Sequence, residues 1–265
     1  MAPILSENLG GKSSFIPHYN LAHNNTYSTK LMGEHIIIPI PIYYLISTMT
    51  VKTKLVAFDM DGTLIQGRLI EVISRKFNLT DKVSLIQSDP SLLGYQKTRL
   101  IASVLKGIKE KEIVDSIDSI PIMHNADKIV SWFRKNGYKT GIITDSYSIA
   151  ARVVAKKLDL DFCSANELII KDGSVTGEIE MPLGWEKIGC LCNISICKRF
   201  HLTHYAKKYG VHIKDTIAIG DTRGDICMIK QAGLGIAFMP KDQDIIRQSK
   251  NIIHNPDLIE VLNYM

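Results

Sequence analysis

Short apolar runs alternate with helical patterns from Lys54 to the end of the sequence, and this alternation constrains the fold more than any other feature. The runs lie at residues 55–58, 141–143, 216–219 and 235–238, with amphipathic helical patterns between them. Strand–helix–strand units of this kind build a parallel sheet with helices on both faces. The sequence therefore predicts an α/β fold with a doubly wound parallel sheet.

Residues 67–123 interrupt this alternation after the first strand. The segment carries amphipathic helical patterns, notably at residues 92–106, whereas a βα connection usually has only about 2–6 residues. An insertion at this point lies above the carboxyl ends of the strands, where such sheets bind ligands. We expect residues 49–66 and 124–265 to form the core and residues 67–123 to form an inserted helical cap.

Residues 1–48 show no sustained period of either strand or helix and no obvious fold of their own. Met49 directly precedes the well-patterned part of the chain. The segment is therefore either a surface-lying N-terminal extension or the product of a mis-assigned start, with translation beginning at Met49.

Two acids follow the first strand in the run Asp59-Met60-Asp61-Gly62-Thr63. Carboxylates two residues apart at a strand end can point the same way, and Gly62 permits a sharp exit from the strand. One acid can attack phosphorus as a nucleophile while the other protonates the leaving oxygen and later activates water. The alternative is an acidic turn without chemistry.

Further polar residues follow at later positions of the same pattern. Thr144 follows an apolar run, so its hydroxyl and the N–H groups of a helix start could hold a phosphoryl oxygen, or it could simply cap the helix. Lys198 opens a helical pattern and could neutralise a carboxylate and a phosphoryl group, or be a surface lysine. Asp221 and Asp225 follow another strand and suit a hard divalent cation. Because carboxyl ends of parallel strands share one edge, we expect these residues to converge.

Together, the run 59–63, Thr144, Lys198 and the pair Asp221 and Asp225 resemble the four motifs of haloacid dehalogenase (HAD) superfamily phosphatases. Residues 164–168 and 171–177 are similar to the hairpin segment of the phosphoserine phosphatase branch. The resemblance covers about residues 51–262. It implies a HAD-like Rossmannoid core and a small phosphorylated metabolite as the binding partner.

The resemblance also implies roles for single residues. Asp59 would be the nucleophile and Asp61 the general acid and base, while Lys198 would serve catalysis and, with Thr144, bind phosphate. The implied reaction is hydrolysis of O-phosphoserine to serine through an aspartyl phosphate, as in serine biosynthesis. The reaction class asks the protein mainly to position the phosphoryl group and to place cations around its oxygens.

A magnesium ion is the cofactor that the resemblance implies. Mg²⁺ would be held by Asp59, the backbone carbonyl of Asp61 and Asp221, with Asp225 in support; a few carboxylates suffice because this ion keeps several waters. Two alternatives stay open: a phosphotransferase that passes the phosphoryl group to an alcohol, and a non-catalytic module that binds phosphorylated ligands.

The candidate substrate-binding residues depart from the phosphoserine phosphatase pattern. Arg68 stands where that branch usually has a glutamate for the substrate ammonium, which an arginine would repel. Asp145 interrupts the family's small Ser-Gly-Gly run. Arg99, in the expected cap, could bind a carboxylate bidentately or be a solvated helix charge. Phosphoserine is the expected substrate, and the alternative is another small anionic phosphomonoester of the phosphoglycolate or sugar phosphate type.

Five cysteines make an odd number, which favours a reducing compartment, and we expect a cytoplasmic protein. Cys190, Cys192 and Cys197 lie close in sequence to His201 and form either a metal site without common finger spacing or a packed loop with buried thiols. The 32 basic residues exceed the 27 acidic ones only slightly and form no charge block, so the sequence favours neither nucleic-acid nor membrane binding.

Overall fold

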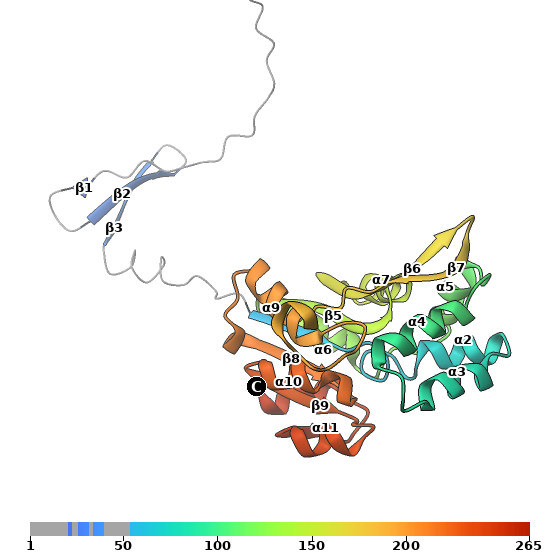
Figure 1. The fold of residues 1–265 in the computed structure, drawn as a ribbon. Coiled ribbons are helices and arrows are strands. Elements are labelled where there is room, and N and C mark those ends of the chain that lie inside the picture. Colours follow the sequence, from blue (N-terminus) through green and yellow to red (C-terminus); the bar gives the residue numbers. More distant parts are fainter. Residues whose placement is uncertain (1–20, 23–25, 32–33, 40–53) are drawn as a thin grey trace, which may run out of the picture. The chain divides into compact units, whose positions relative to one another are not determined.

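The computed structural model describes residues 21–22, 26–31, 34–39 and 54–265 (Figure 1). The strands β1 (Leu21–Ala22), β2 (Thr26–Leu31) and β3 (Glu34–Pro39) form a small antiparallel sheet in the order β1-β2-β3. The sequence of residues 1–48 shows no sustained period, yet these described residues form strands, and their threonines, tyrosine and isoleucines favour that conformation. The proposed start at Met49 lies outside the described residues.

Residues 54–265 contain a seven-stranded sheet in the order β10-β9-β8-β4-β5-β6-β7. Its strands pair in parallel except for β6 and β7, which form an antiparallel hairpin. The strands are β4 (Lys54–Phe58), β5 (Tyr138–Tyr147), β6 (Phe162–Lys171), β7 (Ser174–Glu180), β8 (Thr216–Gly220), β9 (Leu234–Phe238) and β10 (Asn251–Ile253). The predicted doubly wound α/β fold is confirmed, although the three residues of β10 were too few to be recognised from their pattern.

Helices separate the strands along the chain. The α-helices are α2 (Leu69–Lys76), α3 (Thr80–Ser88), α4 (Gly94–Val104), α5 (Glu110–Asp118), α6 (Ala126–Lys135), α7 (Ser148–Lys157), α8 (Trp185–Ile188), α9 (Lys198–Lys208), α10 (Ile226–Gln231) and α11 (Gln243–Gln248). The 3₁₀ helices are η1 (Ile213–Asp215), η2 (Arg223–Asp225) and η3 (Leu258–Tyr264). Within the described ranges, no helix combines the length and the apolar character needed to cross a membrane.

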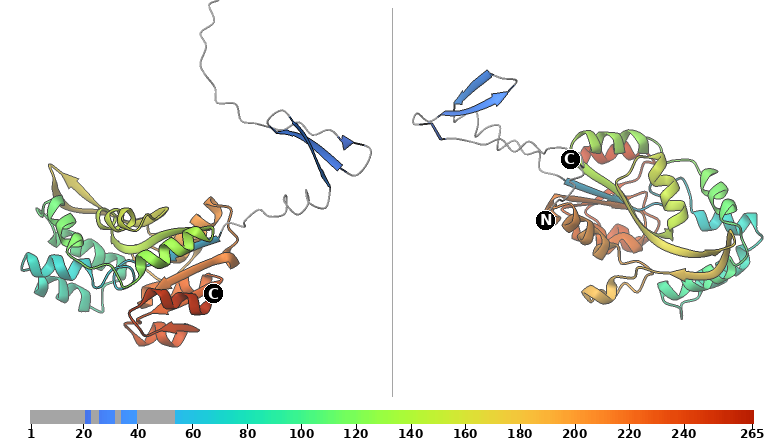
Figure 2. Two further views of the ribbon diagram at one scale, coloured as in Figure 1. Left: turned by 180° about the vertical axis from the view of Figure 1, so that it is seen from behind. Right: turned by 90° about the horizontal axis from the view of Figure 1, so that it is seen from above.

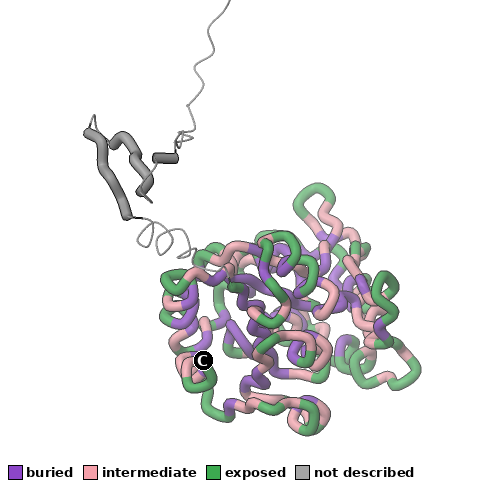
Figure 3. The backbone as a smooth tube through the Cα atoms, turned by 90° about the vertical axis from the view of Figure 1, so that its left-hand side faces the viewer, coloured by how far each residue is buried: buried purple, intermediate pink, exposed green. Residues whose placement is uncertain are grey.

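The central strand β4 is buried on both faces, as Figure 3 shows for the middle of this unit. Its successive side chains alternate between two hydrophobic clusters, because neighbouring residues of a strand point to opposite faces. Val56 and Phe58 join the cluster that includes α6 and α7. Leu55 and Ala57 join the cluster that includes α9 and α10. The carboxyl end of β4 is thus fixed from both sides.

Helices α2–α5 occupy the interruption between β4 and α6, and Figure 2 shows them grouped beside the β6–β7 hairpin. The tip of the hairpin is bonded to them: the N–H of Gly107 donates to the carbonyl of Val175 (2.8 Å) and that of Glu110 to the carbonyl of Gly173 (3.0 Å). The hairpin therefore ties the inserted helices to the sheet.

Helix α6 buries one apolar face, which comprises Ala126, Ile129, Val130 and Phe133. Asparagine is a common helix cap, but the Asn125 side chain makes no capping hydrogen bond here. Asn125 has a left-handed backbone (φ 56°), and its side-chain amide donates to the carboxylate of Asp257 at 2.8 and 2.9 Å. The amide is engaged in this distant contact instead of the first turn of the helix.

Replacing Phe133 by alanine tests how far the α6 face stabilises the fold. The fully buried ring of Phe133 packs against those of Phe58 and Tyr138, at centroid distances of 6.1 and 4.9 Å. We expect Phe133→Ala to lower the free energy of unfolding by about 3–5 kcal/mol in denaturant titrations. Leu85→Ala, at a side chain that is 73% exposed, is the control and should cost less than about 0.5 kcal/mol. Equal losses in both variants would contradict the assignment.

Candidate active site

The loop after β4 is held in a tight turn that presents two acids. The N–H of Asp59 donates to the carbonyl of Ile219 on β8 (2.8 Å). Gly62 adopts φ 84°, and a side chain at this position would collide with the carboxylate of Asp221. Glycine therefore serves two needs here, a left-handed backbone and close approach of a neighbouring acid.

Lys198 connects the nucleophile candidate with the late acidic loop. Its Nζ donates to Oδ1 of Asp59 and to Oδ1 of Asp225, both at 2.6 Å. Lys198 is only 2% exposed, so the alternative of a surface lysine is wrong. Burial alone would lower the pKa of Lys198, but the Asp225 and Asp59 carboxylates outweigh it and raise the pKa, which keeps the ammonium charged.

Asp225 uses its other oxygen to shape the loop after β8. Its Oδ2 accepts the N–H groups of Asp221 (3.2 Å) and Thr222 (3.0 Å) and the hydroxyl of Thr222 (3.2 Å). With Lys198 on Oδ1, both carboxylate oxygens of Asp225 are engaged by protein donors. Asp225 therefore orients the loop and the ammonium.

Asp221 has the opposite environment. Ligand atoms of Asp59, Asp221 and Asp225 all lie within 4.8 Å of one another, and Asp221 is fully buried. Among the described residues, neither carboxylate oxygen of Asp221 has a hydrogen-bond partner. Burial, followed by the Asp225 charge, raises the pKa of Asp221 to about 7. Buried, unpartnered carboxylate oxygens beside two further acids fit a hard divalent cation such as Mg²⁺.

Asp61 is half-buried and lies apart from the lysine contact. Its Oδ1 accepts the N–H of Leu69 at the start of α2 (2.7 Å). Burial raises the pKa of Asp61 to about 6, although the hydrogen bond from Leu69 opposes the shift. Burial, with the charges of Asp225 and Asp221, also raises the pKa of Asp59 against the effect of Lys198. A carboxyl group with a pKa near 6 can both donate and accept a proton near neutral pH.

A cavity of about 130 Å³ joins these acids to the inserted helices. Its lining comprises Asp59, Asp61, Arg68, Ile70, Gln87, Thr98, Ile101, Asp145, Ser146, Tyr147 and Thr222. These residues come from the loops after β4 and β8, from the end of β5, and from α2, α3 and α4. Since a water takes about 30 Å³ of liquid, a cavity of this volume suits a small molecule.

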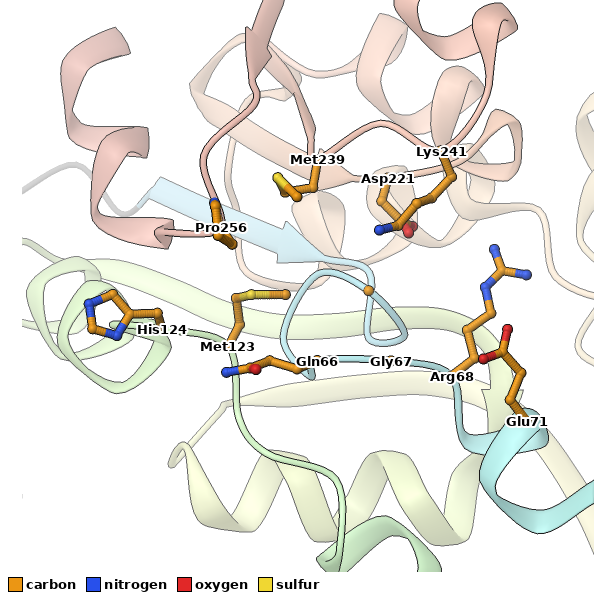
Figure 4. A pocket seen from close by; sticks show the side chains of 11 residues that line it. Gln66, Gly67, Arg68, Glu71, Met123, His124, Asp221, Met239, Lys241 and Pro256 are labelled. Atoms are coloured by element: carbon orange, nitrogen blue, oxygen red, sulfur yellow. The ribbon is translucent and has the colours of Figure 1, made fainter. Parts of the chain in front are cut away.

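A second cavity, of about 710 Å³, shares Arg68 with the first and is shown in Figure 4. Its lining comprises Gly62, Gln66, Gly67, Arg68, Glu71, Met123, His124, Asp221, Met239, Lys241 and Pro256. In Figure 4 the guanidinium of Arg68 points toward the end of the cavity where Asp221 and Lys241 lie. Arg68 therefore borders both cavities and is the cation that they share.

The structure brings some of the other expected substrate residues to the cavity and leaves others out. Asp145 lines it, whereas Arg99 is exposed on α4, where Thr98 and Ile101 face the cavity instead. Thr144 is fully buried at the end of β5, and its hydroxyl accepts the N–H of Ser146 (3.2 Å). The expectation of a helix start at Thr144 is wrong, because β5 runs past an irregularity to Tyr147 and α7 follows it.

Two residues near the cavity were not expected from their local pattern. The side-chain amide of Asn166 donates to the carbonyl of Asp145 (2.6 Å) and to the hydroxyl of Ser195 (2.8 Å), so it positions the end of β5. Thr222 lines the cavity and donates to Asp225. Asn166 sits in the segment 164–168 that resembles the phosphoserine phosphatase hairpin, and this was the one signal that could have found it.

The match to a family model decides the classification. The model of haloacid dehalogenase-like hydrolases matches residues 56–230, which include every acid of the site and Lys198. The chain belongs to this family. The predictions of a HAD superfamily member and of a phosphatase within it are confirmed.

Individual relatives agree with the family assignment. A phosphoserine phosphatase of Methanocaldococcus jannaschii is 32% identical over 82% of this chain and 100% of its own length. Another, of Mycobacterium tuberculosis, is 30% identical over 71% of this chain but only 44% of its own length. A solved structure described as a phospho-aspartyl intermediate analogue of phosphoserine phosphatase has a TM-score of 0.70 and 30% identity, and covers 81% of this chain and 99% of its own.

Magnesium binding should depend on pH through Asp221. The pKa of this group, about 7 against an ordinary 3.8, means that its stabilising contribution is present at low pH and is lost as pH rises toward 7 without metal. Below pH 7, Mg²⁺ must displace the proton of Asp221. The apparent affinity for Mg²⁺ should therefore fall by up to about tenfold for each unit by which the pH is lowered. In thermal melts we expect Mg²⁺ to raise Tm more at pH 8 than at pH 5.5.

Asp221→Asn is the control for this measurement, because the amide cannot ionise. It should show a smaller Mg²⁺ response that depends less on pH, because Asp59 is the remaining carboxylate ligand with a raised pKa. Equal increases in Tm at pH 5.5 and pH 8 in the unmodified protein would contradict the role of Asp221.

Proposed function

We propose that this protein is a Mg²⁺-dependent phosphomonoester hydrolase that works through an aspartyl phosphate on Asp59, with O-phosphoserine as the expected substrate. The observation that carries the proposal is the buried bridge of Lys198 between Asp59 and Asp225, beside the unpartnered carboxylate of Asp221. Residues 67–123 act as the cap over a core of residues 49–66 and 124–265. The relatives named as phosphoserine phosphatases support this reading.

The first step forms a bond between an Asp59 carboxylate oxygen and phosphorus as the bond from phosphorus to the leaving oxygen breaks. Asp61 gives its proton to that leaving oxygen, and Lys198 compensates charge on the nucleophile and the phosphoryl group. In the second step Asp61 takes a proton from water, whose oxygen attacks phosphorus and releases phosphate from Asp59. The pKa of Asp61, about 6, suits both directions of proton transfer.

Asp59, Asp221 and the backbone carbonyl of Asp61 would hold Mg²⁺, with Asp225 in support through the loop and Lys198. When bound, the ion supplies positive charge that stabilises the phosphoryl oxygens. The protein residues then have the task of aligning the carboxylate of Asp59 with the scissile bond inside the small cavity.

The substrate depends on Arg68. Burial would lower the pKa of Arg68, but the carboxylates of Asp221 and Asp145, with Asp61 and Asp59, raise it, so the guanidinium stays charged at the cavity wall. A fixed cation there favours a second anionic group on the substrate and disfavours an ammonium. This observation supports the alternative substrate class, a small anionic phosphomonoester of the phosphoglycolate type.

A cytoplasmic location is the accompanying proposal. All five cysteines are free thiols, which is usual in a reducing compartment. A step in serine biosynthesis, which consumes phosphoserine, would take place there.

Replacing the nucleophile tests the mechanism. Asp59→Asn keeps the size of the side chain but removes its nucleophilic carboxylate, so we expect turnover of a generic phosphomonoester to fall by roughly 10³-fold or more. Circular dichroism and thermal melts check that the fold persists. Mass analysis after an acid quench should find a phosphorylated peptide containing Asp59 in the unmodified protein. Undiminished turnover in a well-folded variant would end the nucleophile assignment.

Reversing the charge of Arg68 tests the substrate. We expect Arg68→Glu to raise the ratio of kcat/KM for phosphoserine to kcat/KM for phosphoglycolate by about 10–100-fold. The glutamate carboxylate attracts the ammonium of phosphoserine, whereas phosphoglycolate offers only a carboxylate, which the glutamate repels. Arg99→Glu makes the same charge change on an exposed residue of α4 and should leave the ratio unchanged. An unaltered ratio in Arg68→Glu would show that the residue does not face the substrate.

A further inference from the structure

Four of the five cysteines meet where the loop between α8 and α9 contacts α10. The sulfur atoms of Cys190, Cys192 and Cys197 all lie within 4.8 Å of one another. The sulfur of Cys227, 37 positions after Cys190, lies 3.8 Å from the Cys190 sulfur. All four are free thiols, so the fold gathers them without a covalent link.

The spacing of these sulfurs suits a tetrahedral metal site. Sulfur ligands that bind Zn²⁺ at about 2.3 Å in tetrahedral geometry lie about 3.8 Å apart. The contact of Cys190 with Cys227 has this length, and the sulfurs of Cys192 and Cys197 lie within 4.8 Å of the Cys190 sulfur. Metal sites commonly combine ligands from one loop with a ligand from a distant element.

The exposure of residues in the loop between α8 and α9 indicates that its thiols order it. Leu191 is 90% exposed, while Cys190 before it is only 9% exposed. The Cys-x-Cys spacing turns Cys190 and Cys192 to one side and Leu191 to the other. Leu191 is thereby left in solvent, without apolar packing. Buried Cys197 then ends the loop at the start of α9. An exposed leucine between inward thiols indicates that the thiols, and not apolar packing, determine how the loop lies.

The contacts within the cluster favour a thiolate at Cys197, whereas burial raises the pKa of Cys227 to about 11 and the hydrogen bond with Cys197 raises the pKa of Cys192. A hydrogen bond from the Cys192 thiol, together with the backbone N–H of Phe200, lowers the pKa of Cys197 although burial opposes it. Thiolates are the form that binds metal. His201 lies outside the group of atoms within 4.8 Å of one another, and its Nδ1 lies 3.1 Å from the hydroxyl of Ser164.

We propose that Cys190, Cys192, Cys197 and Cys227 form a binding site for a thiolate-preferring divalent cation, Zn²⁺, separate from the magnesium site. Each thiol that binds releases its proton to solvent, and no oxidant or reductant is required. A disulfide between Cys190 and Cys227 would use only two of the four sulfurs, whereas a metal ion can bind all four.

The site would fix a loop that serves the active centre in two ways. Cys197 directly precedes Lys198, so the position of the cluster sets the start of the helix that carries the buried ammonium. The loop also contacts the inserted helices: the N–H of Tyr95 on α4 donates to the carbonyl of Asn193 (3.0 Å), and the rings of Tyr95 and Trp185 lie 5.9 Å apart. The site is thus a structural clip between α10, α9 and α4.

The test loads the full-length, reduced protein with Zn²⁺ or Co²⁺ in excess Mg²⁺, which occupies oxygen ligands. We expect one Zn²⁺ per chain by elemental analysis after gel filtration, and the strong sulfur-to-metal absorption of thiolate-bound Co²⁺. Both signals should be lost in Cys192→Ser and Cys227→Ser. They should persist in Cys163→Ser, which removes the one cysteine outside the cluster, and in Asp221→Asn, which alters the magnesium site.

Alkylation of the unmodified protein keeps the proposal testable if the variants do not fold. Zn²⁺ should slow the modification of the four clustered thiols, mapped by mass spectrometry, and leave that of Cys163 unchanged. Absence of Zn²⁺ binding, binding that survives Cys192→Ser with Cys227→Ser, or a Cys190–Cys227 disulfide in protein isolated without reductant would each overturn the proposal.

Discussion

The rest of the site depends on the ammonium of Lys198, buried between Asp59 and Asp225. A buried charge is tolerated only when it is paired and hydrogen-bonded, and here both partners lie at 2.6 Å. Three carboxylates around one ammonium still leave two negative charges uncompensated, which is the charge of one divalent cation. The raised pKa values of Asp59 and Asp221 express the same imbalance. The metal-free centre is thus arranged to be completed by a cation.

The parallel sheet explains why residues so far apart in sequence meet there. Strands β4, β5 and β8 are neighbours in one sheet, so the loops that follow their carboxyl ends share one edge. The two hydrophobic clusters clamp β4 from both faces and leave little freedom to the turn that carries Asp59 and Asp61. The inserted helices then close the cavity over this edge, because the β6–β7 hairpin holds them to the sheet.

Sequence reasoning succeeded where a polar residue directly follows a buried run, as at Asp59 and Asp221, because strand ends can be read from hydropathy alone. It failed where backbone geometry intervenes: β5 continues past an irregularity, so Thr144 lies before the end of the strand and not at a helix start. The sequence could not predict which face of α4 points to the cavity. Thr98 lines the cavity, whereas the next residue, Arg99, is exposed. Cys227 escaped notice since only the tertiary fold brings it to Cys190.

Chemistry and substrate choice occupy physically different parts of this protein. Asp59, Asp225 and Lys198 are held together by buried hydrogen bonds, so replacing one of them leaves a buried charge short of a partner. Arg68 lies on the loop that leads into α2 and borders both cavities, where a substitution alters the charge presented to the substrate but breaks no buried pair among the catalytic acids. A family can therefore keep its phosphoryl chemistry while the residue at this position redirects it to a substrate of different charge.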